Sequence, residues 1–344
     1  MKRLVSVITA LLICATFVAA CSAQAEDPTT PALQGVGALE EANSEDPQRI
    51  RIICTIFPLY DWTRQIIGEE NLDRFDLTFL INSGIDLHSF NPSVSDIARI
   101  KTSDVFIYIG GHSDSWVENV LRGASPDLVA MNMLDILAEL TDEQPLLDGF
   151  CEVDCDDDHD HNFELPHADE HVWLSLSRAI TLCAAIADML AELDPENALI
   201  YADNASAYIA ELSSLDARFQ AAVNEANVTT LVFADRFPFR YMFNDYGLTY
   251  YAAFRGCSAE SEASFVTIIS LANRINQLGL STVLVTESSN QSIARTVISN
   301  TETADQRILV LNAVHSVTVS EARTGVTYLS LMENNLVVLH EALR

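Results

Sequence analysis

The chain has 344 residues, of which 49% are apolar, and its 49 acidic residues outnumber 19 basic ones to give a formal net charge of −30. This length and apolar content suit two modest domains better than one. A polyanion is repelled by phosphate backbones, which excludes nucleic acid as an expected partner. The excess of acidic residues mainly serves solubility, and it attracts cations weakly and without selectivity.

The first twenty residues predict a signal peptide. Lys2 and Arg3 precede an apolar run over residues 4–20 that is too short and too isolated for a membrane span. The run ends in small residues before Cys21, as in the bacterial lipobox, where the cysteine is lipidated and becomes the new N-terminus. An ordinary signal peptide, with Cys21 incidental, is the alternative. We therefore expect a lipid-anchored protein on the extracytoplasmic face of the cell membrane.

Residues 21–48 are rich in Ala, Glu, Pro and Gly and lack apolar periodicity, which is typical of a flexible tether. From residue 49 onward, strand and helix patterns alternate. Strands are predicted over 51–57, 76–81 and 105–109, and helices over 59–67 and 93–100. Strands separated by helices imply a parallel sheet that is covered on both faces. The alternation predicts an N-terminal α/β lobe over residues 49–175.

An acidic loop over residues 148–170 interrupts this pattern. It carries three histidines, His159, His161 and His167. The loop could collect metal ions, or it could be no more than a solvated acidic segment. Cys151 and Cys155 are close enough in sequence to form a disulfide, which an exported protein can retain. Cys183 lies on an apolar helical face, where a buried free thiol is expected.

A helical linker is predicted over residues 176–227. It contains a helix over 177–192 and, after Asp194-Pro195, a second helix that runs to about residue 226. Some thirty residues at about 1.5 Å each span about 45 Å, so this helix could join two lobes as a strut. Strands then recur over 230–234, 249–253, 282–285 and 308–311, with helices over 238–245, 264–278, 291–300 and 327–342. These elements predict a C-terminal α/β lobe over residues 228–344.

Five side chains that could ligate a metal lie next to predicted strands or helices. They are His88, His171, Asp235, Glu287 and His315. In open α/β sheets, ligands bind at the loops beyond the carboxyl ends of the strands, so these side chains could converge on one cleft between the lobes. Neutral imidazole is a good zinc ligand, and carboxylates can complete its coordination shell. Any one of them alone is a weak signal, and it is their shared placement that predicts a metal site.

Three segments of the chain resemble a known family. They are Thr55–Trp62, the His88 segment with Asn91-Pro92-Ser93, and Asp169–Leu174. Over roughly residues 50–344, the chain is similar to the zinc and manganese solute-binding lipoproteins of ABC importers. The resemblance implies two parallel-sheet α/β lobes joined by a long rigid helix, with His88 and His171 as ligands in a metal cleft between them. It also implies a monomer that delivers a divalent metal ion to an ABC permease in the membrane.

The second lobe departs from the family's pattern. Arg236 stands where the family usually has His or Glu, and Asn312 stands where it usually has Asp. A guanidinium has no acceptor and cannot ligate a cation. Either Asp235 is the ligand, or the second lobe uses His315 or Glu287, and an ion pair between Asp235 and Arg236 is an equally good interpretation. We take Asp235 and His315 as the second-lobe candidates.

Two other functions fit parts of the sequence. The segment from His167 to His171, with Glu170 between them, has the spacing of the inverted zinc-peptidase motif. That chemistry needs both histidines on one continuous helix, whereas Pro166 precedes this segment. A metal-binding surface adhesin is the other alternative. We expect a binding protein and no enzyme, with Zn²⁺ favoured by nitrogen ligands and Mn²⁺ possible if more carboxylates contribute.

Overall fold

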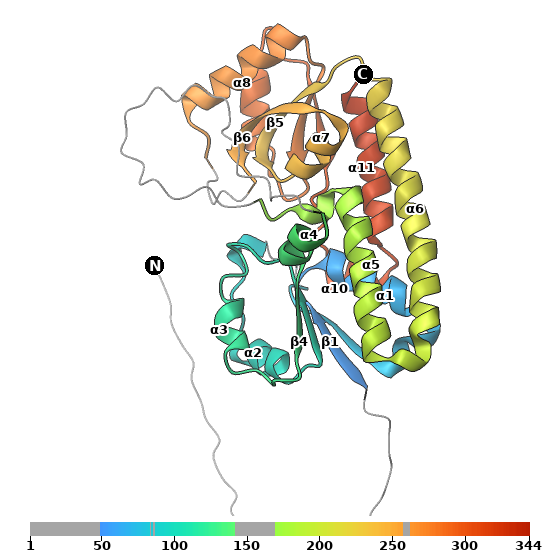
Figure 1. Cartoon of the computed structure of the whole chain (residues 1–344). Helices are drawn as coiled ribbons and strands as arrows, with labels where there is room; N and C mark the ends of the chain where they lie inside the picture. Colours follow the sequence, from blue (N-terminus) through green and yellow to red (C-terminus); the bar gives the residue numbers. More distant parts are fainter. Residues whose placement is uncertain (1–48, 83, 85–86, 142–168, 257–261) are drawn as a thin grey trace, which may run out of the picture. The chain divides into compact units, whose positions relative to one another are not determined.

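The computed structural model describes residues 49–82, 84, 87–141, 169–256 and 262–344 (Figure 1). All of them belong to one compact unit, Pro47–Arg344. The predicted signal peptide, Cys21, the tether, the three loop histidines and the Cys151–Cys155 pair lie outside the described residues. Among the residues that are described, no helix is long and apolar enough to cross a membrane.

The first sheet has four parallel strands in the order β2-β1-β3-β4. The strands are β1 (Ile50–Cys54), β2 (Phe75–Phe79), β3 (Val105–Tyr108) and β4 (Val129–Asn132), and the helices are α1 (Phe57–Ile67), α2 (Val94–Lys101), α3 (Val117–Leu121) and α4 (Met133–Thr141). Successive side chains of β1 point to opposite faces. Ile52 packs in the core that contains α1, whereas Ile53 packs with Ile100 of α2 and Val120 of α3. Helices therefore cover this sheet on both faces.

The second sheet repeats the same arrangement, with parallel strands in the order β6-β5-β7-β8. The strands are β5 (Thr230–Phe237), β6 (Thr249–Arg255), β7 (Thr282–Thr286) and β8 (Arg307–Leu311), and the helices are α7 (Arg240–Tyr246), α8 (Phe265–Leu278), α9 (Ser292–Ser299), α10 (Val319–Arg323) and α11 (Tyr328–Ala342). Val232 of β5 packs with α8 and α9, while Leu231 and Phe233 face the other core. The predicted α/β fold with two parallel sheets is confirmed.

Two helices, α5 (Leu176–Leu193) and α6 (Ala198–Asn224), connect the sheets. The 27 residues of α6 make it about 40 Å long at about 1.5 Å per residue. It packs on α1 and α5 of the first half and on α7 and α11 of the second, and Figure 1 shows it beside α5 and α11. Its buried stripe recurs every three or four residues: Tyr201, Ala205, Tyr208, Leu212, Leu215 and Phe219. The predicted long helix is confirmed, although it starts at Ala198 because Pro195–Asn197 forms a 3-10 turn.

Some predicted boundaries shift for local reasons. The first strand ends at Cys54, because helix α1 begins at Phe57 with Pro58 in its first turn. The elements β4, α3, α4 and α10 were not predicted. β4 is an edge strand whose first two residues are exposed, so it lacks the apolar run of a buried strand. Cys183 is buried and free, as predicted, and so is Cys54.

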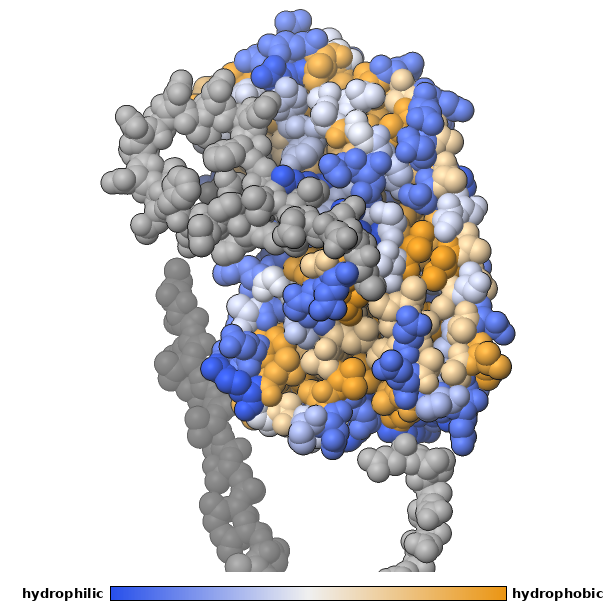
Figure 2. Space-filling model, viewed as in Figure 1, coloured by the Kyte–Doolittle hydropathy of each residue, from blue (hydrophilic) through white to orange (hydrophobic). Residues whose placement is uncertain are grey.

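The most exposed large apolar side chains lie on four helices, and Val129 of β4 and Val310 of β8 are also exposed. Those on the helices are Val94 on α2, Leu199 on α6, Phe265 and Val266 on α8, and Val337 on α11. On the face that Figure 2 shows, hydrophobic residues are interspersed with hydrophilic ones. Scattered apolar side chains are normal for a protein surface, so they do not by themselves define a docking site.

Candidate metal-binding site

Three imidazole rings from distant parts of the chain lie together. His88 belongs to the 3-10 turn Leu87–Ser89, His171 directly precedes the 3-10 turn Val172–Leu174, and His315 lies between β8 and α10. The ring centroids of His88 and His171 are 5.2 Å apart, and those of His88 and His315 are 6.4 Å apart. The structure therefore brings together three of the predicted site residues, two from the first half and one from the second.

The spacing of these rings can be compared with zinc geometry. Two imidazoles that bind one tetrahedral zinc ion through nitrogens at about 2.0–2.1 Å have ring centroids about 5 Å apart. The His88–His171 pair matches this spacing, and the His88–His315 pair is wider. As the side chains stand, no group of three or more His, Cys, Asp and Glu in the described part of the chain is arranged to hold a metal ion. His88 and His171 are thus spaced as two ligands of one zinc ion, and the His315 ring lies close to them.

A carboxylate holds the His171 ring. Oδ1 of Asp169 accepts a hydrogen bond from the His171 backbone N–H at 2.9 Å and lies 2.9 Å from Nδ1 of the same residue. Both side chains are almost completely buried. A carboxylate at Nδ1 favours the tautomer with its proton there, which makes Nε2 the ligating nitrogen. Asp169 was not singled out in the sequence, although its position two residues before a histidine is a usable signal.

Trp173 joins the His171 segment to the loop that carries His315. Its ring centroid is 5.1 Å from that of His171 and 6.0 Å from that of His315. Its indole N–H donates to the carbonyl oxygen of Ala313 at 2.8 Å, and its own carbonyl accepts from the Tyr328 hydroxyl at 2.6 Å. Because Trp173 is fully buried, the two histidines are tied through one rigid side chain.

The His315 loop is shaped by Glu287, a candidate ligand, and by Asn312, which stands where the family usually has Asp. Glu287 accepts the Ala313 N–H through Oε2 at 2.8 Å, and Asn312 accepts the Val314 N–H through Oδ1 at 2.6 Å. Burial raises the pKa of the Glu287 carboxyl, and the hydrogen bond from Ala313 opposes that shift. Val314 has a φ of 66°, a left-handed conformation that β-branched residues rarely adopt. The backbone next to His315 is therefore held in a specific, strained shape.

Asp235 lies inside strand β5 and not after it as predicted, because the strand continues to Phe237 past a bulge between Phe233 and Arg236. Its Oδ1 accepts the Arg236 backbone N–H at 2.8 Å. Its Oδ2 accepts the backbone N–H of Thr286 at 3.1 Å and the Thr286 hydroxyl at 2.7 Å. These bonds tie the end of β5 to the end of β7.

A second carboxylate beside His171, that of Glu170, holds a glycine turn. Its Oε1 accepts the Ser113 N–H at 2.8 Å, and a Cβ on Gly111 would lie 2.6 Å from its Cγ. Nearby, Asp114 accepts the Gly110 N–H at 3.0 Å. Burial, with a smaller contribution from the charge of Glu170, raises the pKa of Asp114 to about 7. Glu170 thus fixes the turn that follows β3.

Similarity to known proteins shows the family of the chain. Residues 52–342 match the family described as zinc-uptake complex component A, periplasmic (ZnuA). The chain belongs to this family. The match covers most of the chain and confirms the resemblance seen in the sequence.

Two relatives and one solved structure place the chain within the ZnuA family. The zinc-binding lipoprotein AdcA of Streptococcus pneumoniae is 28% identical over 341 residues, which cover 99% of this chain and 61% of AdcA. The high-affinity zinc uptake system protein ZnuA of Bacillus subtilis is 24% identical over 300 residues, which cover 86% of this chain and 88% of that protein. The Zn(II)-bound ZnuA-like domain of S. pneumoniae AdcA superposes with a TM-score of 0.67 at 27% identity, over 86% of this chain and 99% of that domain. The chain thus spans about three fifths of the length of AdcA.

ZnuA family membership favours metal uptake over the peptidase alternative, since the family is described as part of an uptake complex. The structure agrees, because Glu170 and His171 precede the turn at Val172 and helix α5 starts only at Leu176. The other histidine of that motif, His167, lies outside the described residues. Residues 169–171 are therefore not part of a continuous helix of the kind that the peptidase chemistry needs.

Proposed function

We propose that this protein binds one Zn²⁺ ion outside the cytoplasmic membrane and passes it to an ABC importer. The observation that carries the proposal is the 5.2 Å spacing of the His88 and His171 rings, which fits two ligands of one zinc ion. Zinc is named in the descriptions of the family and of its relatives AdcA and ZnuA. The partner would be a membrane permease that receives the metal from a monomer.

His315 is our third ligand. Its ring is 6.4 Å from that of His88, so a small movement of its side chain toward His88 would complete a set of three imidazoles. His315 also comes from the second lobe, whereas the other two come from the first. Three nitrogen donors favour zinc over manganese. This assignment of ligands uses the predicted division of the chain into an N-terminal lobe (49–175), a helical linker (176–227) and a C-terminal lobe (228–344).

Asp235 is our candidate for the fourth ligand. A carboxylate has about four lone-pair positions, so an oxygen that already accepts a hydrogen bond can still coordinate a metal. Ligating carboxylates are themselves commonly hydrogen-bonded, as Asp235 is by Thr286. Glu287, whose Oε2 supports the His315 loop, is the neighbouring alternative.

Zinc should stabilise the folded protein. At a free concentration one hundred times the dissociation constant, the stabilisation is expected to be about 2.7 kcal/mol, because zinc binds the native state and not the unfolded one. Thermal unfolding of the metal-stripped protein with added Zn²⁺ measures it, and Mg²⁺, which prefers oxygen ligands, serves as the control. Identical melting temperatures with and without Zn²⁺ would remove the basis of the proposal.

Gly256 lies against the His171 ring. A Cβ there would be 3.1 Å from Cε1 of His171 and 2.9 Å from the Phe237 carbonyl oxygen. Gly256→Ala should therefore shift the Phe237 carbonyl and the imidazole away from the new methyl group, and weaken zinc binding by about tenfold, the size of an outer-shell change. A competition titration with a chromophoric chelator measures this. In the control Gly123→Ala, the added Cβ meets only the flexible end of Lys101, so equal affinities in the two variants would contradict the argument.

We also propose that Cys21 carries a lipid that anchors the protein to the extracytoplasmic face of the membrane, with residues 1–20 as the signal peptide and residues 21–48 as the tether. The lipobox-like residues before Cys21 support this. Cys21→Ala should move the protein from the membrane fraction to the medium or periplasm and abolish labelling by a fatty acid. Unchanged membrane association of the variant would count against a lipid anchor at this residue.

A further inference from the structure

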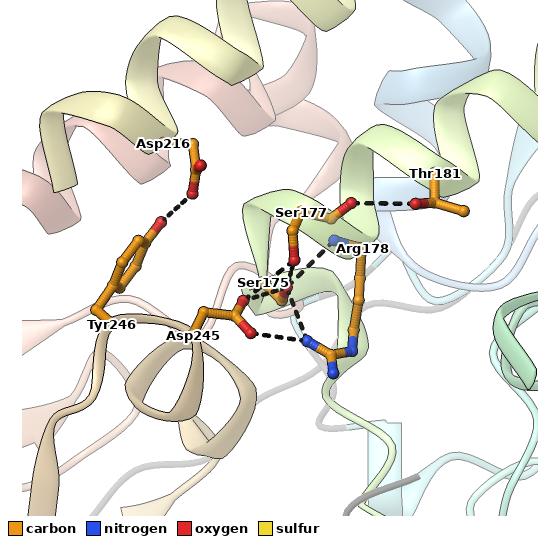
Figure 3. Close-up of polar contacts among 7 residues, drawn as sticks. All are labelled: Ser175, Ser177, Arg178, Thr181, Asp216, Asp245 and Tyr246. Atoms are coloured by element: carbon orange, nitrogen blue, oxygen red, sulfur yellow. Dashed lines mark hydrogen bonds and ion pairs between the residues drawn. The ribbon is translucent and has the colours of Figure 1, made fainter. Parts of the chain in front are cut away.

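Helix α7 of the second lobe is fastened to the start of α5 (Figure 3). Near the end of α7, the Asp245 carboxylate accepts hydrogen bonds from the Ser175 hydroxyl at 2.5 Å and from Nη1 of Arg178 at 2.9 Å. Ser175 is the N-cap of α5, and its hydroxyl oxygen accepts the Arg178 N–H at 3.2 Å. The Arg178 and Asp245 side chains are only 9% and 15% exposed, so water weakens their attraction little.

The same arginine reaches a tyrosine that contacts the His171 segment. The Arg178 guanidinium lies over the ring of Tyr241, 4.4 Å from its centroid, in a cation–π arrangement. The Tyr241 hydroxyl donates to the backbone carbonyl of Asp169 at 3.0 Å, and Tyr241 is fully buried. The side chain of Asp169 in turn holds the backbone N–H and Nδ1 of His171. A continuous set of contacts therefore runs from α7 to this imidazole.

We propose that Tyr241, on α7 of the second lobe, and Arg178, at the start of α5, are positioning residues that set the His171 imidazole. The inference rests on the proposed function, because it assigns them to the zinc site. Helix α7 follows directly from β5, which carries Asp235, our candidate fourth ligand. A displacement of the β5 end on metal binding would move α7. Tyr241 would pass that displacement to the backbone carbonyl of Asp169, two residues before His171. The two lobes thereby share control of one ligand.

Tyr241→Phe tests this contact, since it removes only the hydroxyl that holds the Asp169 carbonyl. Tyr246→Phe is a matched control on the same helix, where the lost hydroxyl donates to Oδ1 of Asp216 on α6 at 2.7 Å (Figure 3). The zinc dissociation constant of each full-length variant is measured by chelator competition. The visible spectrum of the Co²⁺-loaded protein reports coordination geometry, and urea unfolding without metal reports stability.

Tyr241→Phe is expected to weaken zinc binding by about tenfold, as outer-shell changes do, and to alter the Co²⁺ spectrum, while Tyr246→Phe changes neither. Arg178→Lys keeps the charge beside Asp245 but loses the planar group over the ring, so it should also weaken binding. The double variant should weaken zinc binding by less than the product of the two single fold-changes, because both substitutions act through the Asp169 carbonyl.

The outcomes separate the two proposals. If the unaltered protein binds no zinc, the proposed function fails. If it binds zinc and Tyr241→Phe matches Tyr246→Phe in affinity and spectrum, only the positioning role fails. Loss of stability in Tyr241→Phe without a change in the Co²⁺ spectrum would equally reject the positioning role, since it would show a purely structural contact.

Discussion

Replacing His171 with Ala is expected to weaken zinc binding by at least about a hundredfold. Changes to the outer shell of a metal site cost about 10–100-fold in affinity, so loss of a ligating nitrogen should reach the upper value or exceed it. His171 is the best-supported of the candidate ligands, because it is buried, its Nδ1 is held by Asp169 and its ring lies 5.2 Å from that of His88.

The measurement is a competition titration of the metal-stripped protein against a chromophoric zinc chelator. His340→Ala is the control, because it removes an imidazole near the end of α11, where it lies close to Arg344 rather than to the three clustered rings. His88→Ala should behave like His171→Ala. If His171→Ala retained the affinity of the His340→Ala control, the site would lie elsewhere in the chain.

The second large effect is a pH dependence of stability that arises from Asp61. This side chain of α1 is 1% exposed, and its Oδ2 accepts the Tyr328 N–H at the start of α11 at 2.8 Å. Burial raises its pKa to about 6, above the value of 3.8 for an exposed carboxyl. The folded state therefore binds a proton that the unfolded state releases. This contribution is fully present below about pH 4 and is lost as the pH rises through about 6.

Two pKa units correspond to about 3 kcal/mol, so the protein should gain about that much stability relative to Asp61→Asn between pH 7 and pH 4. The free energy of unfolding in urea, measured for both proteins at several pH values, gives the difference directly. Asp203→Asn, an exposed position on α6, corrects for the loss of one negative charge from a polyanion. A difference between the protein and Asp61→Asn that stays constant across this range would show that Asp61 does not titrate as its burial predicts.

The sequence predicted the fold well because its signals are repeated and regular. Seven of the strands in the described residues were predicted to alternate with helices, and the buried stripe of α6 recurs with helical spacing over 27 residues. The placement of His88 and His315 could also be anticipated, because each follows a parallel strand, β2 or β8, and ligands bind beyond the carboxyl ends of such strands. His171 precedes a helix, and it was grouped with them through the resemblance of its segment to the family.

The contacts that hold the site together could not be predicted in this way. The indole N–H of Trp173 bonds a carbonyl 140 residues away, and Gly256 packs on the His171 ring across the two lobes. No local pattern encodes such pairs, since they depend on how the two sheets meet. The bulge in β5 is similar: it keeps Asp235 within the strand, where the sequence placed it in the following loop. Side-chain pairing of this kind emerges only in the folded chain.

X-ray absorption at the zinc edge tests the central claim most directly. For the protein loaded with one equivalent of Zn²⁺, we predict two or three imidazole nitrogens at about 2.0–2.1 Å, with no sulfur ligand. The imidazole signal should disappear when His88 and His171 are both replaced by Ala. A zinc shell of oxygen atoms alone, or one with sulfur at about 2.3 Å, would contradict a site built on these histidines.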